Sequence, residues 1–292
     1  MSASVTLPAR SGAQPALARP SRAPEEKGKW WRFALLIVLT ALTLIPIAVV
    51  IGLSLQPSAA STTTDPITLE NFATVLTETS VLVWLRNSLV VTLATVLVSV
   101  LVAAPAGYVL SRGRGRVVSG YSLLLFVIQS LPVIVSVVPL FILFAGFGLS
   151  DSLFGITLVY VGSTIAVATW MMAAYIDSIP IALEEAAWID GASVFGGFVR
   201  IILRNSLPGI LSTAIFAFLL AWNDYLVALV FLRSELSFTL PVGVQSFVQQ
   251  NMTDWGSIMA VSVIMMIPPI LLFATLNRYF SVGGIGGSLA GR

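Results

Sequence analysis

The sequence predicts an all-α membrane protein with six transmembrane helices and with both termini on the cytoplasmic side. The first observation is composition: 57% of the 292 residues are hydrophobic and 10% are charged, whereas a soluble domain carries about 25% charged residues. A chain of this length cannot hide so much apolar surface in its own core, so the bilayer is its expected solvent. The second observation is that six stretches are apolar over the ~20 residues that a helix needs to cross the hydrocarbon layer.

The N-terminal segment 1–29 is rich in Ala, Pro and Ser and carries scattered Arg and Lys residues. Such a segment cannot bury enough apolar area to offset the entropy lost on ordering, so we expect a disordered basic tail. Residues 30–292 are expected to form a single transmembrane domain, because their sequence shows neither an internal repeat nor a second domain.

The predicted spans are residues 33–55, 88–110, 120–147, 153–176, 209–232 and 256–280. The first span is too long for the apolar core of a cleavable signal peptide and is expected to stay in the membrane. The third span contains Pro132 and Pro139, and proline inside a spanning helix removes a backbone hydrogen bond and bends the helix. Such a bend is compatible with a helix along a transport pathway and equally with a packing kink.

The basic residues predict the orientation. With both termini inside, every Lys and Arg except Arg86 and Arg233 lies in an inward segment. Cytoplasmic segments of membrane proteins carry an excess of these residues. The termini, the turn 112–116 and the loop 177–208 are therefore expected to be cytoplasmic, with the arginines of the turn acting as topology determinants.

Two outer segments are long enough to have structure of their own. Residues 66–83 place Leu69, Phe72 and Leu76 on one helical face, which predicts a short helix lying on the outer surface. Residues 233–255 contain the polar run that begins at Gln249. This second segment is either a rim that contacts a delivered ligand or partner, or a plain connector.

The composition excludes most enzyme chemistry. The chain has no Cys and no His, which removes disulfides, thiolate nucleophiles, His-based acid–base catalysis and Cys/His metal sites. Its two lysines, Lys27 and Lys29, lie in the N-terminal tail, and no G-x-x-x-x-G-K-[ST] loop exists. The chain therefore has no visible means of hydrolysing ATP by itself and is not expected to be an enzyme.

The loop 177–208 is too polar to lie in lipid, and its sequence predicts a helix, a glycine turn and a second helix. Ser178 is expected to cap the first helix and Pro180 to lie in its first turn. The acidic Glu184 and Glu185 suit the N-terminal end of the helix dipole, and Ala186 and Ala187 have high helix propensity. Gly191, which follows Asp190, ends the helix, since glycine adopts a left-handed cap without steric cost.

The second predicted helix begins at Ser193, which can cap it, and its apolar side carries Phe195, Phe198, Ile201 and Ile202. Small residues on the first helix would let another protein approach closely, and a carboxylate would offer a partner arginine a bidentate ligand. An amphipathic segment that lies on the lipid surface would show the same pattern. The residues alone leave docking and lipid contact open.

The loop resembles the EAA loop of bacterial ABC-importer permeases, and more closely that of carbohydrate-importer permeases of the maltose type. The resemblance covers about residues 30–292. One departure is Arg204, which stands where the family loop usually has a proline; Pro208 is the candidate helix breaker in its place. The matching residues are Glu185-Ala186-Ala187-Trp188-Ile189-Asp190-Gly191-Ala192-Ser193, Phe198, Ile201-Ile202-Leu203, Asn87-Ser88, Ala221-Trp222-Asn223-Asp224-Tyr225, Thr239-Leu240-Pro241 and Arg278-Tyr279-Phe280 before a glycine-rich tail.

The resemblance implies a type I ABC-importer permease fold and a permease subunit that carries a carbohydrate across the bacterial inner membrane. It implies a second permease, a dimeric ATPase that binds ATP and Mg²⁺, and an extracytoplasmic solute-binding protein, with no cofactor in this chain. The loop would be a coupling helix seated in the ATPase, in which Glu185 pairs with the ATPase and Gly191 makes the turn. Nucleic acid is not an expected partner.

Asp224 is a charge inside a predicted span. A carboxylate there costs about 2.5–3.5 kcal/mol on insertion scales, so it is expected to face a partner or a watery cavity. Asn223 beside it, and Gln129 in the third span, are further candidates for a translocation path. A polar clamp that fixes the fifth span is the alternative to direct sugar contact.

Two other classes of protein remain open on the sequence. A secondary transporter driven by an ion gradient would explain Asp224 but not the structured loop around Glu185. A membrane scaffold that docks an ATPase and transports nothing would explain the loop but leave Asp224 without a role.

Overall fold

The structure, a computed structural model, describes the backbone of residues 29–57, 65–248 and 253–283, with the side chains of 30–276 within these ranges. The predicted tail up to residue 28, the polar run 249–251 and the glycine-rich tail beyond residue 283 lie outside the described residues. The chain divides into two compact units, residues 1–47 and 48–292. The boundary falls inside the first helix.

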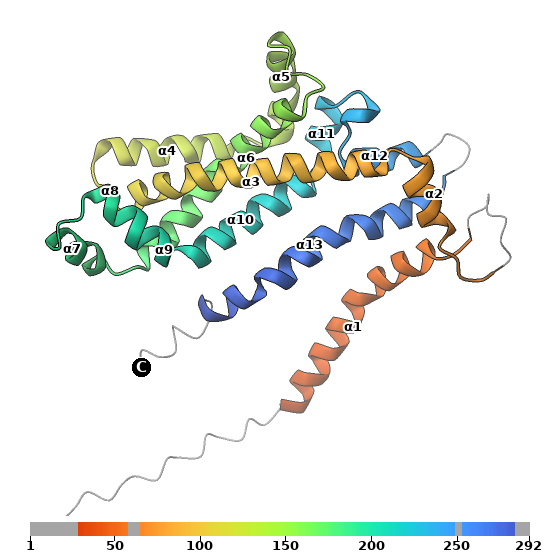
Figure 1. Cartoon of the computed structure of the whole chain (residues 1–292), viewed down its shortest axis with the longest axis horizontal. Coiled ribbons are helices and arrows are strands. Elements are labelled where there is room, and N and C mark those ends of the chain that lie inside the picture. Colours follow the sequence, from red (N-terminus) through yellow and green to blue (C-terminus); the bar gives the residue numbers. More distant parts are fainter. Residues whose placement is uncertain (1–28, 58–64, 249–252, 284–292) are drawn as a thin grey trace, which may run out of the picture. The chain divides into compact units, whose positions relative to one another are not determined.

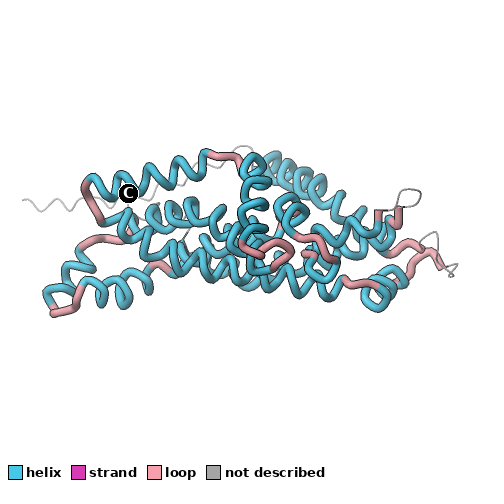
Figure 2. Tube along the Cα trace, turned by 90° about the horizontal axis from the view of Figure 1, so that it is seen from above, coloured by secondary structure: helices cyan, strands magenta, loops and turns pink. Residues whose placement is uncertain are grey.

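The described residues form helices joined by loops (Figures 1 and 2). Within them, β-type pairing is limited to one isolated bridge between Val248 and Thr253. The helices are α1 (Lys29–Ser54), α2 (Glu70–Glu78), α3 (Val81–Arg112), α4 (Arg116–Ser130), α5 (Val133–Gly146), α6 (Leu153–Asp177), α7 (Ala182–Ile189), α8 (Val194–Gly197), α9 (Leu203–Asn205), α10 (Leu207–Trp222), α11 (Leu226–Phe231), α12 (Leu240–Gly243) and α13 (Trp255–Gly283), with the π-helix η1 (Phe198–Ile202) and the 3₁₀ turns η2 (Glu235–Ser237) and η3 (Val244–Phe247).

Helix length and apolarity support four to six membrane spans among the described residues. Four single helices, in α1, α3, α6 and α13, are long and apolar enough to cross a membrane. Two pairs of helices qualify only together: α4 with α5, bent by 94°, and residues 194–205 with α10, bent by 73°. The expectation of an all-helical membrane protein is therefore confirmed, and the count reaches six if each bent pair is one span.

The third and fifth predicted spans are not continuous helices. The third is broken between α4 and α5 at Leu131 and Pro132, so the bend expected at a proline is present. The fifth is interrupted between Trp222 and Leu226. Asp224 Oδ1 accepts hydrogen bonds from the backbone N–H groups of Val227 and Ala228, each at 3.1 Å. A side chain that binds the first N–H groups of a new helix favours a fresh start over continuation.

Helices α3, α6 and α10 pack against one another, and the contact between α3 and α6 is the most extensive. Small residues permit this closeness. A Cβ added to Gly107 of α3 would lie 2.6 Å from Met172 Cβ of α6, and one added to Gly209 of α10 would lie 2.4 Å from Tyr175 Cγ. The buried cores of α3 and α6 therefore bring their backbones into contact, which makes the two helices a firmly packed pair.

The predicted outer helix exists as α2, and the side that packs against the rest of the protein includes a polar residue. Asn71 and Val75 are buried, whereas Leu69 precedes the helix and is 68% exposed and Leu76 is 41% exposed. The Asn71 amide donates to the carbonyl oxygens of Ser54 at 2.9 Å and Gln56 at 2.7 Å. A polar residue turns inward because it satisfies carbonyls at the end of α1 that have no helical partner.

Asp151, in the turn between α5 and α6, holds the segment that follows α11. Its carboxylate accepts hydrogen bonds from the hydroxyl of Ser234 and from the N–H groups of Arg233 at 2.8 Å and Ser234 at 3.1 Å. Partial burial raises the pKa of Asp151, but these hydrogen bonds outweigh burial and the net pKa is lowered. The ionised carboxylate is therefore the form that the folded chain stabilises.

A lowered pKa predicts acid sensitivity. The contribution of Asp151 is complete above the ordinary aspartate pKa and is lost as the pH falls through the lower pKa of the folded state. We expect the melting temperature of the purified protein to decrease as the pH is lowered from about 5 to about 2. The variant Asp151→Asn should show a smaller decrease over the same range. Asn keeps an acceptor oxygen and tolerates the positive φ of 54° at this position. An unchanged pH profile in the variant would contradict the assignment.

Candidate functional site

The loop between α6 and α10 folds as a helical hairpin, residues 182–205, beyond the ends of α3 and α6 (Figure 1). Helix α7 ends at Ile189, and Gly191 has φ +87°, a left-handed conformation that favours glycine. The N–H of Gly191 donates to the Trp188 carbonyl at 3.0 Å and that of Ala192 to the Ala187 carbonyl at 2.9 Å. These two bonds form a Schellman cap, so the predicted glycine stop has the expected geometry.

One predicted cap of the hairpin is present and another is wrong. Ser193 caps the second arm by accepting from the Gly196 N–H at 3.1 Å. Ser178 does not cap α7; its hydroxyl donates to the Tyr175 carbonyl at 2.6 Å, at the end of α6. Pro180 lies before α7, which begins at Ala182 without a side-chain cap. A serine hydroxyl can donate to a preceding carbonyl as readily as it accepts from a following N–H group. Ser178 bonds the carbonyl of Tyr175 at the end of α6.

The second arm contains a π-helical turn, η1, in which the Leu203 N–H donates to the Phe198 carbonyl. Phe198 and Ile202 are buried against α3 and α6, as the apolar pattern predicts. Phe195, expected on the same side, is 74% exposed, because it lies near the glycine turn and beyond that core. After Ser206 the chain bends into α10, where Pro208 lies in the first turn.

The two adjacent glutamates of α7 point in opposite directions. Glu184 is fully buried, and Glu185 is exposed. Glu184 Oε1 lies 2.6 Å from Arg112 Nε, and Glu184 Oε2 accepts from the Tyr108 hydroxyl at 2.8 Å. Glu184 therefore lies between the hairpin and α3, and of the two glutamates only Glu185 is exposed.

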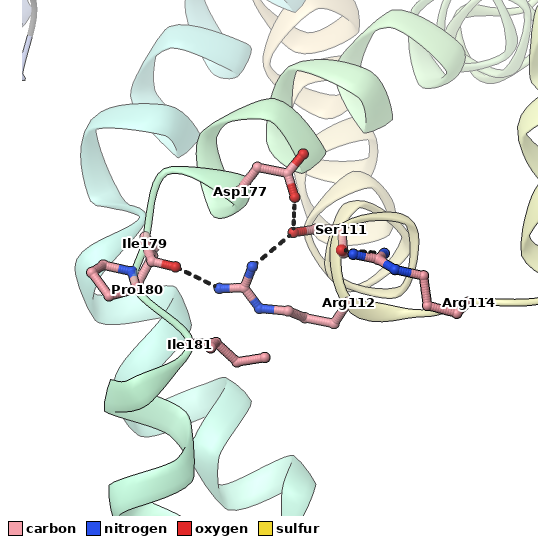
Figure 3. A pocket seen from close by; sticks show the side chains of 7 residues that line it. All are labelled: Ser111, Arg112, Arg114, Asp177, Ile179, Pro180 and Ile181. Carbon is pink, nitrogen blue, oxygen red and sulfur yellow. Dashed lines mark hydrogen bonds between the residues drawn. The ribbon is translucent and has the colours of Figure 1, made fainter.

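Arg112 also closes a pocket of about 500 Å³ between the end of α3 and the linker that leads to α7 (Figure 3). Its guanidinium donates to the Ile179 carbonyl at 2.8 Å and to Ser111 Oγ at 3.2 Å. Ser111 Oγ in turn donates to Asp177 Oδ1 at 2.5 Å. The last turn of α3 is thus bonded to the end of α6, to the linker and to α7.

The outer surface of the hairpin exposes apolar side chains and charges of both signs, the carboxylates of Glu185 and Asp190 and the guanidinium groups of Arg200 and Arg204. Ile189 is 86% exposed and Val194 is 61% exposed, and both flank the glycine turn together with Phe195. Asp190 is exposed beside them. A second pocket, of about 270 Å³, is lined by Ala187, Asp190, Gly191, Ala192, Gly196, Arg200 and Ile201. Exposed large apolar side chains next to a concave surface are typical of a protein contact.

The candidate translocation residues lie on two different elements. Asp224 Oδ1 accepts from the Tyr160 hydroxyl of α6 at 2.8 Å as well as from the start of α11. Asn223 is exposed and its amide donates to the Leu219 carbonyl at 2.8 Å. Gln129 is exposed in the last turn of α4. Asp224 therefore clamps α6 to α11, and Asn223 and Asp224 together interrupt the helix.

Several residues that bond to the candidate site residues are not predicted from the sequence. Tyr108, Ser111 and Tyr160 lie inside apolar spans, where single hydroxyls carry no distinguishing pattern. The sequence predicts Arg112 only as a topology determinant and Asp177 only as the start of the loop. The one available signal was that Glu184, next to a second glutamate, needed a charge partner if buried.

Comparison with known proteins agrees with this architecture. Residues 100–282 match the family described as binding-protein-dependent transport system inner membrane component. A putative ABC transporter permease protein of Streptomyces antibioticus is 36% identical over 70% of this chain and 89% of its own length. The maltodextrin transport system permease protein MdxG of Bacillus subtilis is 33% identical over 77% of this chain and 81% of its own.

A solved structure shares the fold. A chain from a bacterial ABC transporter involved in the import of the acidic polysaccharide alginate matches with a TM-score of 0.73 and 23% identity, over 90% of this chain and 100% of that chain. The chain described here belongs to the binding-protein-dependent transport system inner membrane components. It is a permease subunit of an ABC transporter, and not an enzyme.

Proposed function

We propose that this permease carries a carbohydrate (an oligosaccharide, disaccharide, polyol or sugar phosphate ester) across a bacterial inner membrane. It crosses the membrane six times with both termini in the cytoplasm. It works with a second permease, a dimeric ATPase that binds ATP and Mg²⁺, and an extracytoplasmic solute-binding protein. The names of relatives support the cargo class, since one belongs to a maltodextrin system.

The observation that carries the coupling role is the hairpin itself. Its exposed side presents Ile189 at 86% exposure and the carboxylates of Glu185 and Asp190, while Glu184 is buried against Arg112 of α3. Apolar anchors beside carboxylates suit a cleft lined with arginine. A segment that merely lay on lipid would not need the buried ion pair or the capped turn. Ala186 and Ala187 let the partner approach the backbone closely.

The interruption between α10 and α11 is the proposed wall of the translocation path. Broken helices at membrane depth are tolerated where they line a cavity, and they expose backbone groups to cargo. Asn223 is the exposed residue at this break, and Gln129 of α4 is the further candidate. Asp224 serves as the clamp that keeps the break in place.

Docking is tested by cross-linking the assembled transporter. The chain has no cysteine, so Ile189→Cys creates its only thiol. We expect this variant to cross-link to the ATPase through a short bifunctional reagent. Val117→Cys is the matched control, because Val117 of α4 is also 86% exposed and lies outside the hairpin. A hairpin that stays free in a transporting complex would contradict the proposal.

Transport and cargo are tested separately. We expect vanadate to stop uptake and ionophores to leave it running, because ATP hydrolysis drives it. Uptake stopped only by ionophores would favour an ion-gradient transporter, and no uptake of any sugar would favour a scaffold. A thermal-shift screen of the cognate binding protein against disaccharides, oligosaccharides, polyols and sugar phosphates identifies the cargo.

A further inference from the structure

Helix α3 is not adjacent to the hairpin in the chain and contacts it only through packing and side-chain bonds. The hairpin is continuous in the chain with α6 and α10, whereas Arg112, at the end of α3, and Ile181, just before α7, are 69 positions apart in the sequence. Movement of α7 can therefore pass directly along the backbone to α6 and α10. To move α3 it must pass through side-chain contacts.

The polar contact between them is the Tyr108–Arg112–Glu184 cluster. Both carboxylate oxygens of Glu184 are used, Oε1 by Arg112 Nε at 2.6 Å and Oε2 by the Tyr108 hydroxyl at 2.8 Å. Glu184 is 0% exposed and the Arg112 side chain is 16% exposed. The Tyr108 ring also packs against the ring of Phe198 in the second arm, with the two ring centroids 4.9 Å apart. Each arm of the hairpin therefore touches the same turn of α3.

A buried ion pair is a weak source of stability, because removing the charges from water offsets most of their attraction, and apolar residues of the same size often do as well. What this pair provides is a fixed geometry, since the carboxylate accepts from two donors in defined directions. A contact of this kind resists sliding of α7 along α3. An apolar contact of similar size would allow such sliding.

The cluster extends to α6 through Arg112 and Ser111, which bond the Ile179 carbonyl and Asp177. Farther along the same two helices, Gly107 lies against Met172 and Ala173 so closely that an added Cβ would clash with both. The end of α3 is therefore bonded to Asp177 of α6 and to the linker at Ile179 (Figure 3), and Arg112 also bonds Glu184 of α7. The polar contacts of α7 and of the linker thus meet on the same turn of α3.

We propose that the Tyr108–Arg112–Glu184 cluster is the positioning element that carries motion of α7 to α3. Glu184 acts inside the permease, and the ATPase contact is made by Glu185 and by Ile189 and Asp190 beside the glycine turn. This proposal rests on the proposed coupling function of the hairpin. It makes Glu184 a residue whose loss uncouples the transporter without undocking the ATPase.

The test follows the far end of α3 in the complete transporter in lipid nanodiscs. A cysteine replaces Leu82, which is 55% exposed near the start of α3, about 45 Å from Arg112 along the helix. The rate of reaction with a water-soluble maleimide is measured without nucleotide and after trapping with ATP and vanadate. ATP hydrolysis is measured in the same variants. The cross-link to the ATPase is measured in a second set, in which the same substitutions are combined with Ile189→Cys instead of the cysteine at position 82.

We expect Glu184→Gln to reduce the nucleotide-dependent change at position 82 by about fivefold or more. ATP hydrolysis and the cross-link should stay within about twofold of the parent values. Tyr108→Phe removes one hydroxyl and should cause a smaller loss of the same kind. The exchange Arg112→Glu with Glu184→Arg should restore part of the response. The control Arg114→Gln should change nothing, because Arg114 bonds only the carbonyls of Ser111 and Gly113.

The outcomes separate the two proposals. A full response at position 82 in Glu184→Gln overturns the positioning role. Loss of the response together with hydrolysis and cross-linking, unrelieved by the charge exchange, also overturns it, because the cluster would then only fold the loop. If Glu184→Gln does not assemble, a normal response in Tyr108→Phe overturns the proposal and a selective loss supports it. Failure of the parent Ile189→Cys chain to cross-link would instead refute docking itself.

Discussion

Replacing Gly191 by proline is expected to leave the permease inserted and assembled and to abolish uptake driven by ATP. Gly191 has φ +87°, whereas proline is held near −65° and has no N–H to donate to the Trp188 carbonyl. The turn must therefore be rebuilt, at a cost of about 3 kcal/mol or more. A hairpin with a changed direction cannot seat its tip in the ATPase. Uptake and ATP hydrolysis in reconstituted vesicles measure the loss.

The matched control for this variant is Gly191→Asn. Asparagine tolerates the left-handed conformation better than other side chains and keeps the N–H group. A Cβ at position 191 would meet no atom within 4 Å, so the added side chain has room. We expect uptake near the parent value. Normal uptake by Gly191→Pro would remove the turn from the mechanism, and equal damage by both variants would attribute the effect to side-chain bulk at the partner surface.

The second large effect is expected at Asp224. Asp224→Leu removes the acceptor for the Tyr160 hydroxyl and for the N–H groups of Val227 and Ala228. Tyr160 is only 2% exposed, so its hydroxyl would be left unpaired. Loss of a helix cap and of a buried hydrogen bond to a charged group together cost about 2–5 kcal/mol. We expect a marked fall in the melting temperature of the purified permease complex.

Asp224→Asn separates the clamp from a contact with sugar. The amide oxygen of asparagine can accept the same three hydrogen bonds, so most of the stability should remain. A clamp therefore predicts mild loss in Asp224→Asn and severe loss in Asp224→Leu. Normal melting temperatures in both variants, with weaker stimulation of ATP hydrolysis by loaded binding protein, would instead assign Asp224 to cargo recognition.

Much of the fold could be predicted from composition and periodicity. The first, second, fourth and sixth predicted spans correspond to α1, α3, α6 and α13, and their ends agree within about four residues, except that α3 begins seven residues earlier, at Val81. Apolar content over ~20 residues is a local property, so it can be read without coordinates. The glycine turn at Gly191 and the serine cap at Ser193 were likewise predicted, because each depends on a few neighbouring residues. The family followed from the same loop.

Only the three-dimensional arrangement showed which way the charges face. The sequence placed Glu184 and Glu185 together, but Glu184 turns inward because Arg112 and Tyr108, more than 70 residues away in the chain, supply its partners. Asp224 interrupts the fifth span through its neighbours Val227 and Ala228, but its bond to Tyr160 of α6 depends on how the helices pack. Helix formation is set by neighbours in sequence, whereas the pairing of buried polar groups is set by which helices pack together. That packing is the information a linear pattern does not contain.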